Sequence, residues 1–160
     1  MNQVLKLQRE NMKIQAKHLN KIIQLNLTIP KKEFIYLSLL EEIGELACEL
    51  AIASSYKKRK PSVDGVLGES ADVIICLLSY LYYGVETPFN NDLNMEEYCL
   101  ITPTTEIEQF VNHISIKNFV GRPTILEFPL KVFAEHGGTE ELLNQLLENK
   151  IAKWEKNTNA

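Results

Sequence analysis

The chain has 160 residues, of which 45% are hydrophobic and 24% are charged, and its formal net charge is −4. This length and composition predict one globular domain over residues 1–160. The negative charge argues against a nucleic acid partner. No run of about 18 apolar residues exists, so we expect no membrane span or membrane partner. The amino terminus lacks the apolar core of a signal peptide, and the three cysteines suit free thiols in a reducing compartment. These features predict a cytoplasmic protein.

Two long helices are expected in the first third of the chain. Residues 3–27 contain no Gly or Pro and carry apolar residues at helical spacing, which predicts a helix that Pro30 ends. A second helix is expected from 31 to 56. One face of it is apolar and the opposite face is polar. The apolar face comprises Ile35, Leu39, Ile43, Leu46, Leu50 and Ala53, widened by Tyr36, Leu40, Ala47 and Ala51. The polar face comprises Ser38, Glu41, Glu42, Glu45 and Glu49.

A basic loop separates this helix from a third one. The run Lys57–Ser62 breaks the helical pattern, and Pro61, Gly65 and Gly68 mark a loop. The third helix is expected from 66 to 83 and is apolar nearly all round. A helix of that kind is buried on all sides.

The rest of the chain predicts short helices and then one long helix. Four prolines interrupt the 84–138 segment, where Thr104 or Thr105 could cap a short helix and 125–135 forms another element. Gly137 and Gly138 end that element. Thr139 then has the features of an N-cap for a last helix that runs to 157. The predicted fold is all-α, with four main helices and short helices in the 84–138 segment.

Two acidic pairs are the strongest chemical signal in the sequence. Glu42 and Glu45 lie three residues apart in the second helix, and Glu69 and Asp72 lie three apart in the third. Residues at this spacing share a helix face, so each pair can direct two carboxylates to one point. If the helices pack antiparallel, four carboxylates converge and suit Mg²⁺ or Mn²⁺. The three histidines are scattered and form no zinc-like spacing.

Each pair also has an ordinary structural explanation. The acids of the second helix suit a solvated polar face. Glu69 and Asp72 suit the first turns of a helix, where negative charge is favoured by the helix dipole. The third helix is otherwise apolar, however, so carboxylates there need a partner. The two pairs together favour a metal site.

The acidic pairs resemble a known family signature. Glu41-Glu42-Ile43-Gly44-Glu45-Leu46, followed by Gly68-Glu69-Ser70-Ala71-Asp72-Val73-Ile74, is similar to the E-x-x-E and E-x-x-D motifs of the all-α MazG-like nucleotide pyrophosphohydrolases. The 23 residues from 46 to 68 between the motifs fit the family's spacing. Lys60-Pro61 and the 150–157 ending resemble the family pattern more loosely. The 84–138 segment departs from it, and its length leaves substrate choice and assembly open.

The resemblance implies a reaction, a cofactor and an assembly. It implies a Mg²⁺-dependent enzyme that cleaves a nucleoside triphosphate to a monophosphate and pyrophosphate and forms a homodimer or homotetramer. The implied metal ligands are Glu42, Glu45, Glu69 and Asp72, and Glu45 is our candidate for the general base. The candidates for phosphate binding are Lys57, Lys60, Lys150, Lys153 and Asn157, with Lys58 and Arg59 in the same basic loop. Charged residues in such runs are also common on solvated protein surfaces that bind no ligand.

The sequence leaves three alternative functions open. The protein could be a narrow-specificity dUTPase or dCTPase of the same fold, and only a substrate panel separates these from a broad hydrolase. A phosphoribosyl-ATP hydrolase is a further option. The alternative from another class is a non-catalytic helical interaction module that retains the acidic pairs.

Overall fold

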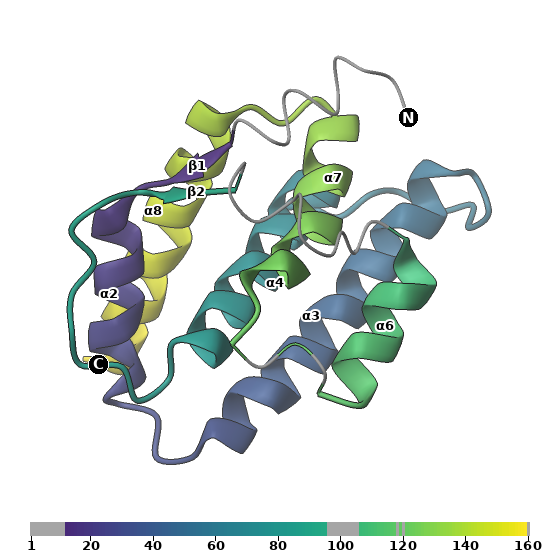
Figure 1. Cartoon of the computed structure of the whole chain (residues 1–160). Coiled ribbons are helices and arrows are strands. Elements are labelled where there is room, and N and C mark those ends of the chain that lie inside the picture. The colour runs from purple at the N-terminus through teal and green to yellow at the C-terminus, as the bar shows by residue number, and fades with distance from the viewer. Residues whose placement is uncertain (1–11, 96–105, 118, 120, 160) are drawn as a thin grey trace.

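The computed structural model describes residues 12–95, 106–117, 119 and 121–159, and most of them are helical (Figure 1). A two-stranded antiparallel ribbon accompanies the helices. The helices are α2 (Ala16–Asn26), α3 (Lys32–Ala53), α4 (Gly65–Leu81), α6 (Ile107–Ser115), the 3₁₀ helix η1 (Pro123–Leu126), α7 (Glu127–Glu135) and α8 (Glu140–Thr158). The strands are β1 (Lys13–Ile14) and β2 (Leu93–Asn94). The prediction of a helical protein is confirmed.

The expected first helix begins later than predicted among the described residues, and its residues 3–11 lie outside them. Residues 13–14 form β1, which pairs Lys13 with Asn94 and Ile14 with Leu93, and α2 begins only at Ala16. The side chain of Asn144 holds this extended backbone. Its Nδ2 donates to the Lys13 carbonyl at 2.8 Å, and its Oδ1 accepts the Gln15 N–H at 3.0 Å. These contacts come from α8, far along the chain, so local spacing does not reveal them.

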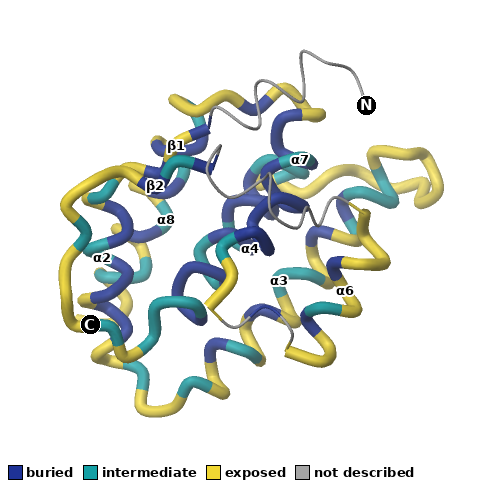
Figure 2. Tube along the Cα trace, in the orientation of Figure 1, coloured by how far each residue is buried: buried dark blue, intermediate teal, exposed yellow. Residues whose placement is uncertain are grey.

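Helix α4 is the centre of the molecule, as its apolar sequence predicts. Val73, Ile74 and Leu77 are fully buried. Helices α2, α3, α7 and α8 all pack against α4, and none of its residues is exposed (Figure 2). Each buried side chain of this size contributes about 1.5–3 kcal/mol. The apolar surface of α4 is therefore covered within one chain, and α7 of the 84–138 segment supplies part of the cover.

Helix α3 packs on α4 with a different face division from the expected one. Glu49, expected on the polar side, is 4% exposed, because the following loop folds back and the Ser62 N–H donates to Glu49 Oε1 at 3.0 Å. Leu40, expected to widen the apolar face, is 45% exposed. Phe34 and Leu37 are exposed near it on α3.

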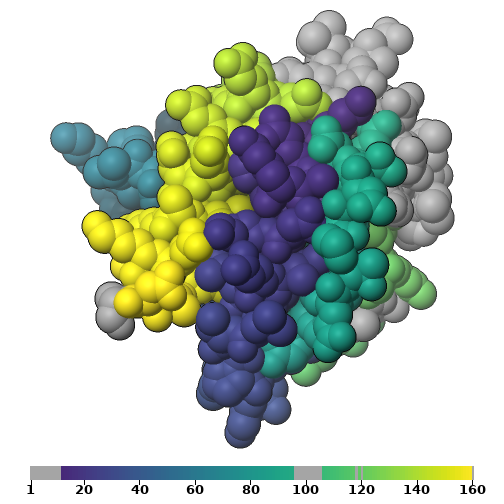
Figure 3. Space-filling model, turned by 90° about the vertical axis from the view of Figure 1, so that its left-hand side faces the viewer, coloured from purple at the N-terminus to yellow at the C-terminus, as the bar shows by residue number. Residues whose placement is uncertain are grey.

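The remaining elements agree closely with the sequence. Thr139 caps α8, since its Oγ1 accepts the Leu142 N–H at 3.2 Å, and Gly137 ends α7 with φ of 88°. Helix α6 begins at Ile107 behind Glu106, and the expected caps Thr104 and Thr105 lie outside the described residues. Figure 3 shows α2 between α8 and the segment that leads to β2. In the described part of the chain, no helix combines the length and apolar character needed to cross a membrane.

Candidate metal centre

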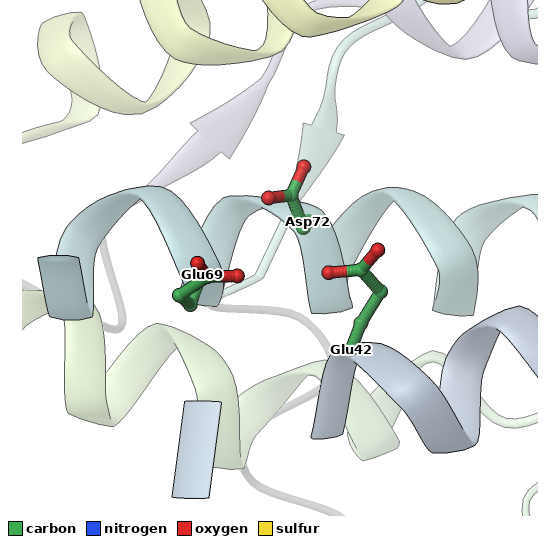
Figure 4. Close-up of side chains that lie close together, drawn as sticks. All are labelled: Glu42, Glu69 and Asp72. Carbon is green, nitrogen blue, oxygen red and sulfur yellow. The ribbon is translucent and has the colours of Figure 1, made fainter. Parts of the chain in front are cut away.

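Three of the four predicted carboxylates converge where α3 crosses α4. Glu42 comes from α3, whereas Glu69 and Asp72 lie one turn apart on α4. One carboxylate oxygen from each lies within 4.8 Å of the others, and Figure 4 shows Glu42 reaching toward the helix that carries Asp72 and Glu69. The i, i+3 spacing on α4 and the packing of α3 against it place these oxygens together. We call Glu42, Glu69 and Asp72 the acidic cluster.

Glu45, the fourth predicted ligand, lies at the edge of the acidic cluster. It is exposed, and after burial its charge is the largest cause of the raised pKa of Glu69. Its charge also contributes to the raised pKa of Glu42 and Asp72, so it faces the same region. A carboxylate that is close to the cluster yet reachable by water is suitably placed for proton transfer.

Like charges crowd the two glutamates of the cluster. Burial, followed by the charges of Asp72 and Glu45, raises the pKa of Glu42 to about 7. Burial, followed by the charges of Glu45, Asp72 and Asp64, raises the pKa of Glu69 to about 7 as well. Carboxylates removed from water and crowded by like charge retain protons unless a cation joins them.

The hydrogen bonding of the cluster fits a bound cation. Among the described residues, the buried Oε2 atoms of Glu42 and Glu69 have no hydrogen-bond partner. A buried carboxylate oxygen without a partner is costly. The donors are all oxygens, which suits a hard divalent ion such as Mg²⁺ or Mn²⁺. The residues present therefore fit the metal that the sequence predicts.

Lys150 is the basic residue that approaches the cluster. From α8 its Nζ lies 2.8 Å from Asp72 Oδ2 and 3.5 Å from Asp64 Oδ2. Burial lowers the pKa of Lys150, but the hydrogen bond to Asp72 and the charges of Asp72 and Asp64 raise it by more. Burial also raises the pKa of Asp72, against the effect of Lys150. A permanent cation thus stands at the edge of the site.

A hollow of about 390 Å³ opens beside the cluster between α3, α4 and α8. Its polar end is formed by Glu42, Asp72 and Lys150, and its apolar wall includes Phe34 and Trp154. Tyr80 and Tyr83, the other aromatics of this region, serve packing instead: Tyr80 is 5% exposed, and Tyr83 Oη donates to the Ile29 carbonyl. Phe34 and Trp154 are therefore the aromatics that offer a ring to a ligand in this hollow.

A second hollow, of about 430 Å³, adjoins Glu69. It is lined by Glu45, Glu49, Cys48 and Arg59 among others. Arg59 Nη2 donates to Cys48 Sγ at 2.6 Å, which holds this part of the basic loop against α3. Arg59 is thus the loop cation that reaches the neighbourhood of the cluster.

The other predicted phosphate ligands are exposed and line neither hollow: Lys57, Lys60, Lys153 and Asn157. Lys57 Nζ lies 3.9 Å from Cys48 Sγ. Cys76 lines the first hollow, and burial, followed by the charges of Glu42 and Asp72, raises the pKa of its thiol, which agrees with a packing role.

The sequence analysis does not identify Asp64, the second carboxylate beside Lys150. The local signal for it is Gly68, one helical turn later.

Comparison with known proteins gives no match: no family model, no curated protein and no solved structure matches the chain.

Proposed function

We propose that the protein is a Mg²⁺- or Mn²⁺-dependent nucleotide pyrophosphohydrolase with a MazG-like fold, which cleaves (d)NTP to (d)NMP and pyrophosphate. The observation that carries the proposal is the acidic cluster. Three carboxylates meet within 4.8 Å, and two of them have a buried oxygen without a partner. A lysine and a ligand-sized hollow adjoin them.

The residues divide the reaction among themselves. Glu42, Glu69 and Asp72 would hold the metal, which polarises phosphate oxygens and makes water more acidic when bound. The exposed Glu45 is suited to accept the proton of a water that attacks the α-phosphorus. The oxygen of that water bonds to the α-phosphorus as the bridging P–O bond to the β-phosphate breaks, and pyrophosphate leaves with the bridging oxygen. The Lys150 ammonium is positioned to bind phosphate oxygens beside the cluster.

The hollow next to the cluster suits the nucleoside part of the substrate. Its polar end is the acidic cluster with Lys150, and its wall carries Phe34 and the half-buried Trp154. An aromatic ring can stack on a base of any identity. This arrangement supports the nucleotide class and leaves a narrow dUTPase or dCTPase as the main alternative.

The outer face of α3 supports a homodimer or homotetramer. Phe34, Leu37 and Leu40 are 48%, 60% and 45% exposed, and they follow one another at helical spacing. Adjacent exposed apolar side chains are typical of protein interaction sites. The same face also suits the second candidate function, a non-catalytic interaction module.

The decisive experiment is pyrophosphate release from a panel of canonical and modified NTPs and dNTPs, with and without Mg²⁺. We expect release that depends on Mg²⁺ and that Glu69→Gln abolishes while the variant remains folded. Release from one nucleotide alone identifies a dUTPase-like or dCTPase-like enzyme. No release from any nucleotide, together with no Mg²⁺ binding by calorimetry, contradicts the hydrolase and favours the interaction module.

A further inference from the structure

Asp64 stands at the N-cap of α4 but does not cap it. Aspartate at this position commonly accepts an N–H of the first turn. Among the described residues, no such bond is made by the Asp64 side chain. Ser62 serves instead, since its Oγ accepts the Gly65 N–H at 3.1 Å. The Asp64 carboxylate is directed elsewhere, and its Oδ2 lies 3.5 Å from Lys150 Nζ.

Gly68 provides the space for this arrangement. A Cβ at Gly68 would lie 2.6 Å from Asp64 Cβ and 3.2 Å from its Cγ. Glycine is unfavourable inside a helix, so a glycine that permits one side chain to lie against the helix has a specific consequence. The Asp64 side chain can reach toward α8 because position 68 has no side chain of its own.

Lys150 is thus held between two carboxylates with different surroundings. The Asp72 side chain is 24% exposed and belongs to the acidic cluster, whereas the Asp64 side chain is 52% exposed and lies outside it. A divalent cation that takes the Asp72 oxygen repels the ammonium from that partner. Asp64 would then be the anion that remains to hold Lys150.

We infer that Asp64 is a positioning residue that keeps the Lys150 ammonium beside the acidic cluster when Asp72 engages a cation. Its benefit to phosphate binding rests on the proposed function. The hold of Asp64 on Lys150 does not, and it can be measured in the absence of metal and nucleotide.

The hold is tested by NMR of the lysine ammonium groups in metal-free protein. An ammonium gives a sharp ¹H–¹⁵N signal only when hydrogen bonds protect its protons from exchange with water, and Lys150→Gln assigns the signal. We expect the Lys150 signal to survive in Asp72→Asn, where Asp64 still holds it, and to vanish in Asp64→Asn/Asp72→Asn. Loss in Asp72→Asn alone, or survival in the double variant, would overturn the inference.

The functional consequence is tested by the affinity for pyrophosphate in the presence of Mg²⁺. We expect Asp64→Asn to weaken pyrophosphate binding about tenfold. It should have no further effect in a Lys150→Gln background, because Asp64 acts on pyrophosphate binding only through Lys150. Gly68→Ala should reproduce the loss with the Asp64 charge intact. Additive losses from Asp64→Asn and Lys150→Gln would contradict the inference.

A matched control lies on the same helix. Glu148 of α8 is 64% exposed, and its Oε1 lies 4.0 Å from Lys17 Nζ, so Glu148→Gln removes a lysine-paired carboxylate outside the site. It should keep the affinity of the wild type. If the wild type itself binds no pyrophosphate, the proposed function fails, while the metal-free NMR result still decides the role of Asp64.

Discussion

The ammonium of Lys150 lies 2.8 Å from Asp72 Oδ2, although 78 positions separate the two residues. The contact brings the last helix of the chain to the carboxylates of α4. It gives the site a permanent cation next to an acidic cluster, a charge arrangement that would suit the metal–triphosphate complex of the proposed reaction.

Substitution of two neighbouring lysines should separate a site residue from a surface residue. Lys150→Gln removes a charge-assisted contact worth about 1.5–3 kcal/mol, so kcat/KM should fall about 10- to 100-fold. Lys153→Gln should change it less than about twofold, because Lys153 is exposed and lines neither hollow. Steady-state kinetics with the preferred nucleotide measures both. Equal losses in the two variants would contradict the assignment of Lys150.

The metal-free protein should lose stability as the pH rises from about 4.5 to about 7. In the folded state burial and neighbouring carboxylates raise the pKa of Glu42 and of Glu69 to about 7, from an ordinary value of 4.5. The folded state therefore binds more protons than the unfolded state in this window, and its stability falls as they are released. Each kcal/mol lost lowers Tm by about 2–4 °C. Mg²⁺ should remove the decline, since it replaces the protons.

The control for this pH dependence has to account for His18. Burial, followed by the charge of Lys17, lowers the pKa of His18, and a depressed histidine makes stability rise with pH in an overlapping window. Glu42→Gln/Glu69→Gln keeps His18 but removes the two carboxyls. Thermal unfolding in chelator from pH 4.5 to 8 should show a decline in the wild type relative to this variant. Parallel curves would contradict the raised pKa values.

Two glycine substitutions should have opposite effects on folding stability. A Cβ at Gly138 would overlap the ring of Phe133, which is fully buried. Gly138→Ala should therefore cost about 1–3 kcal/mol. Gly44→Ala should stabilise by about 0.5–1 kcal/mol, because alanine favours the helix and no described atom lies within 4 Å of the added carbon, apart from those of the flanking residues and the adjacent helix backbone. Urea denaturation measures both, and a destabilised Gly44→Ala would show that the α3 surface is more restricted.

The exposed face of α3 should govern assembly. Leu37→Glu places a charge between the exposed side chains of Phe34 and Leu40 and should convert an oligomer to a monomer. It should not lower Tm, since Leu37 is 60% exposed. Light scattering coupled to size-exclusion chromatography measures the mass. Leu27→Glu, at a residue that is 75% exposed beyond the end of α2, should leave the assembly unchanged. A monomeric wild type would contradict the proposed oligomer.

Local pattern was sufficient for much of the fold. The apolar periodicity of α3, α4 and α8 is generated by neighbours along one helix, so it can be recognised in the sequence alone. The same holds for the N-cap at Thr139 and for the two acidic pairs, because i, i+3 neighbours share a face in any helix. The acids of the candidate centre and the helices that carry them were predictable for that reason.

The tertiary structure decided what depends on partners distant in sequence. Residues 13–14 became a strand because Asn144 and β2 bind their backbone, and Glu49 became buried because Ser62 folds back onto it. Lys150 contacts Asp72 of the cluster, whereas Lys153 on the same helix does not line the hollow beside the cluster. Asp64 pairs with Lys150 of another helix, and Gly68 leaves space for its side chain. Spacing along the sequence does not reveal this contact. Periodicity identifies which face of a helix is apolar or acidic. Only the packing of helices against one another determines which residues that face contacts.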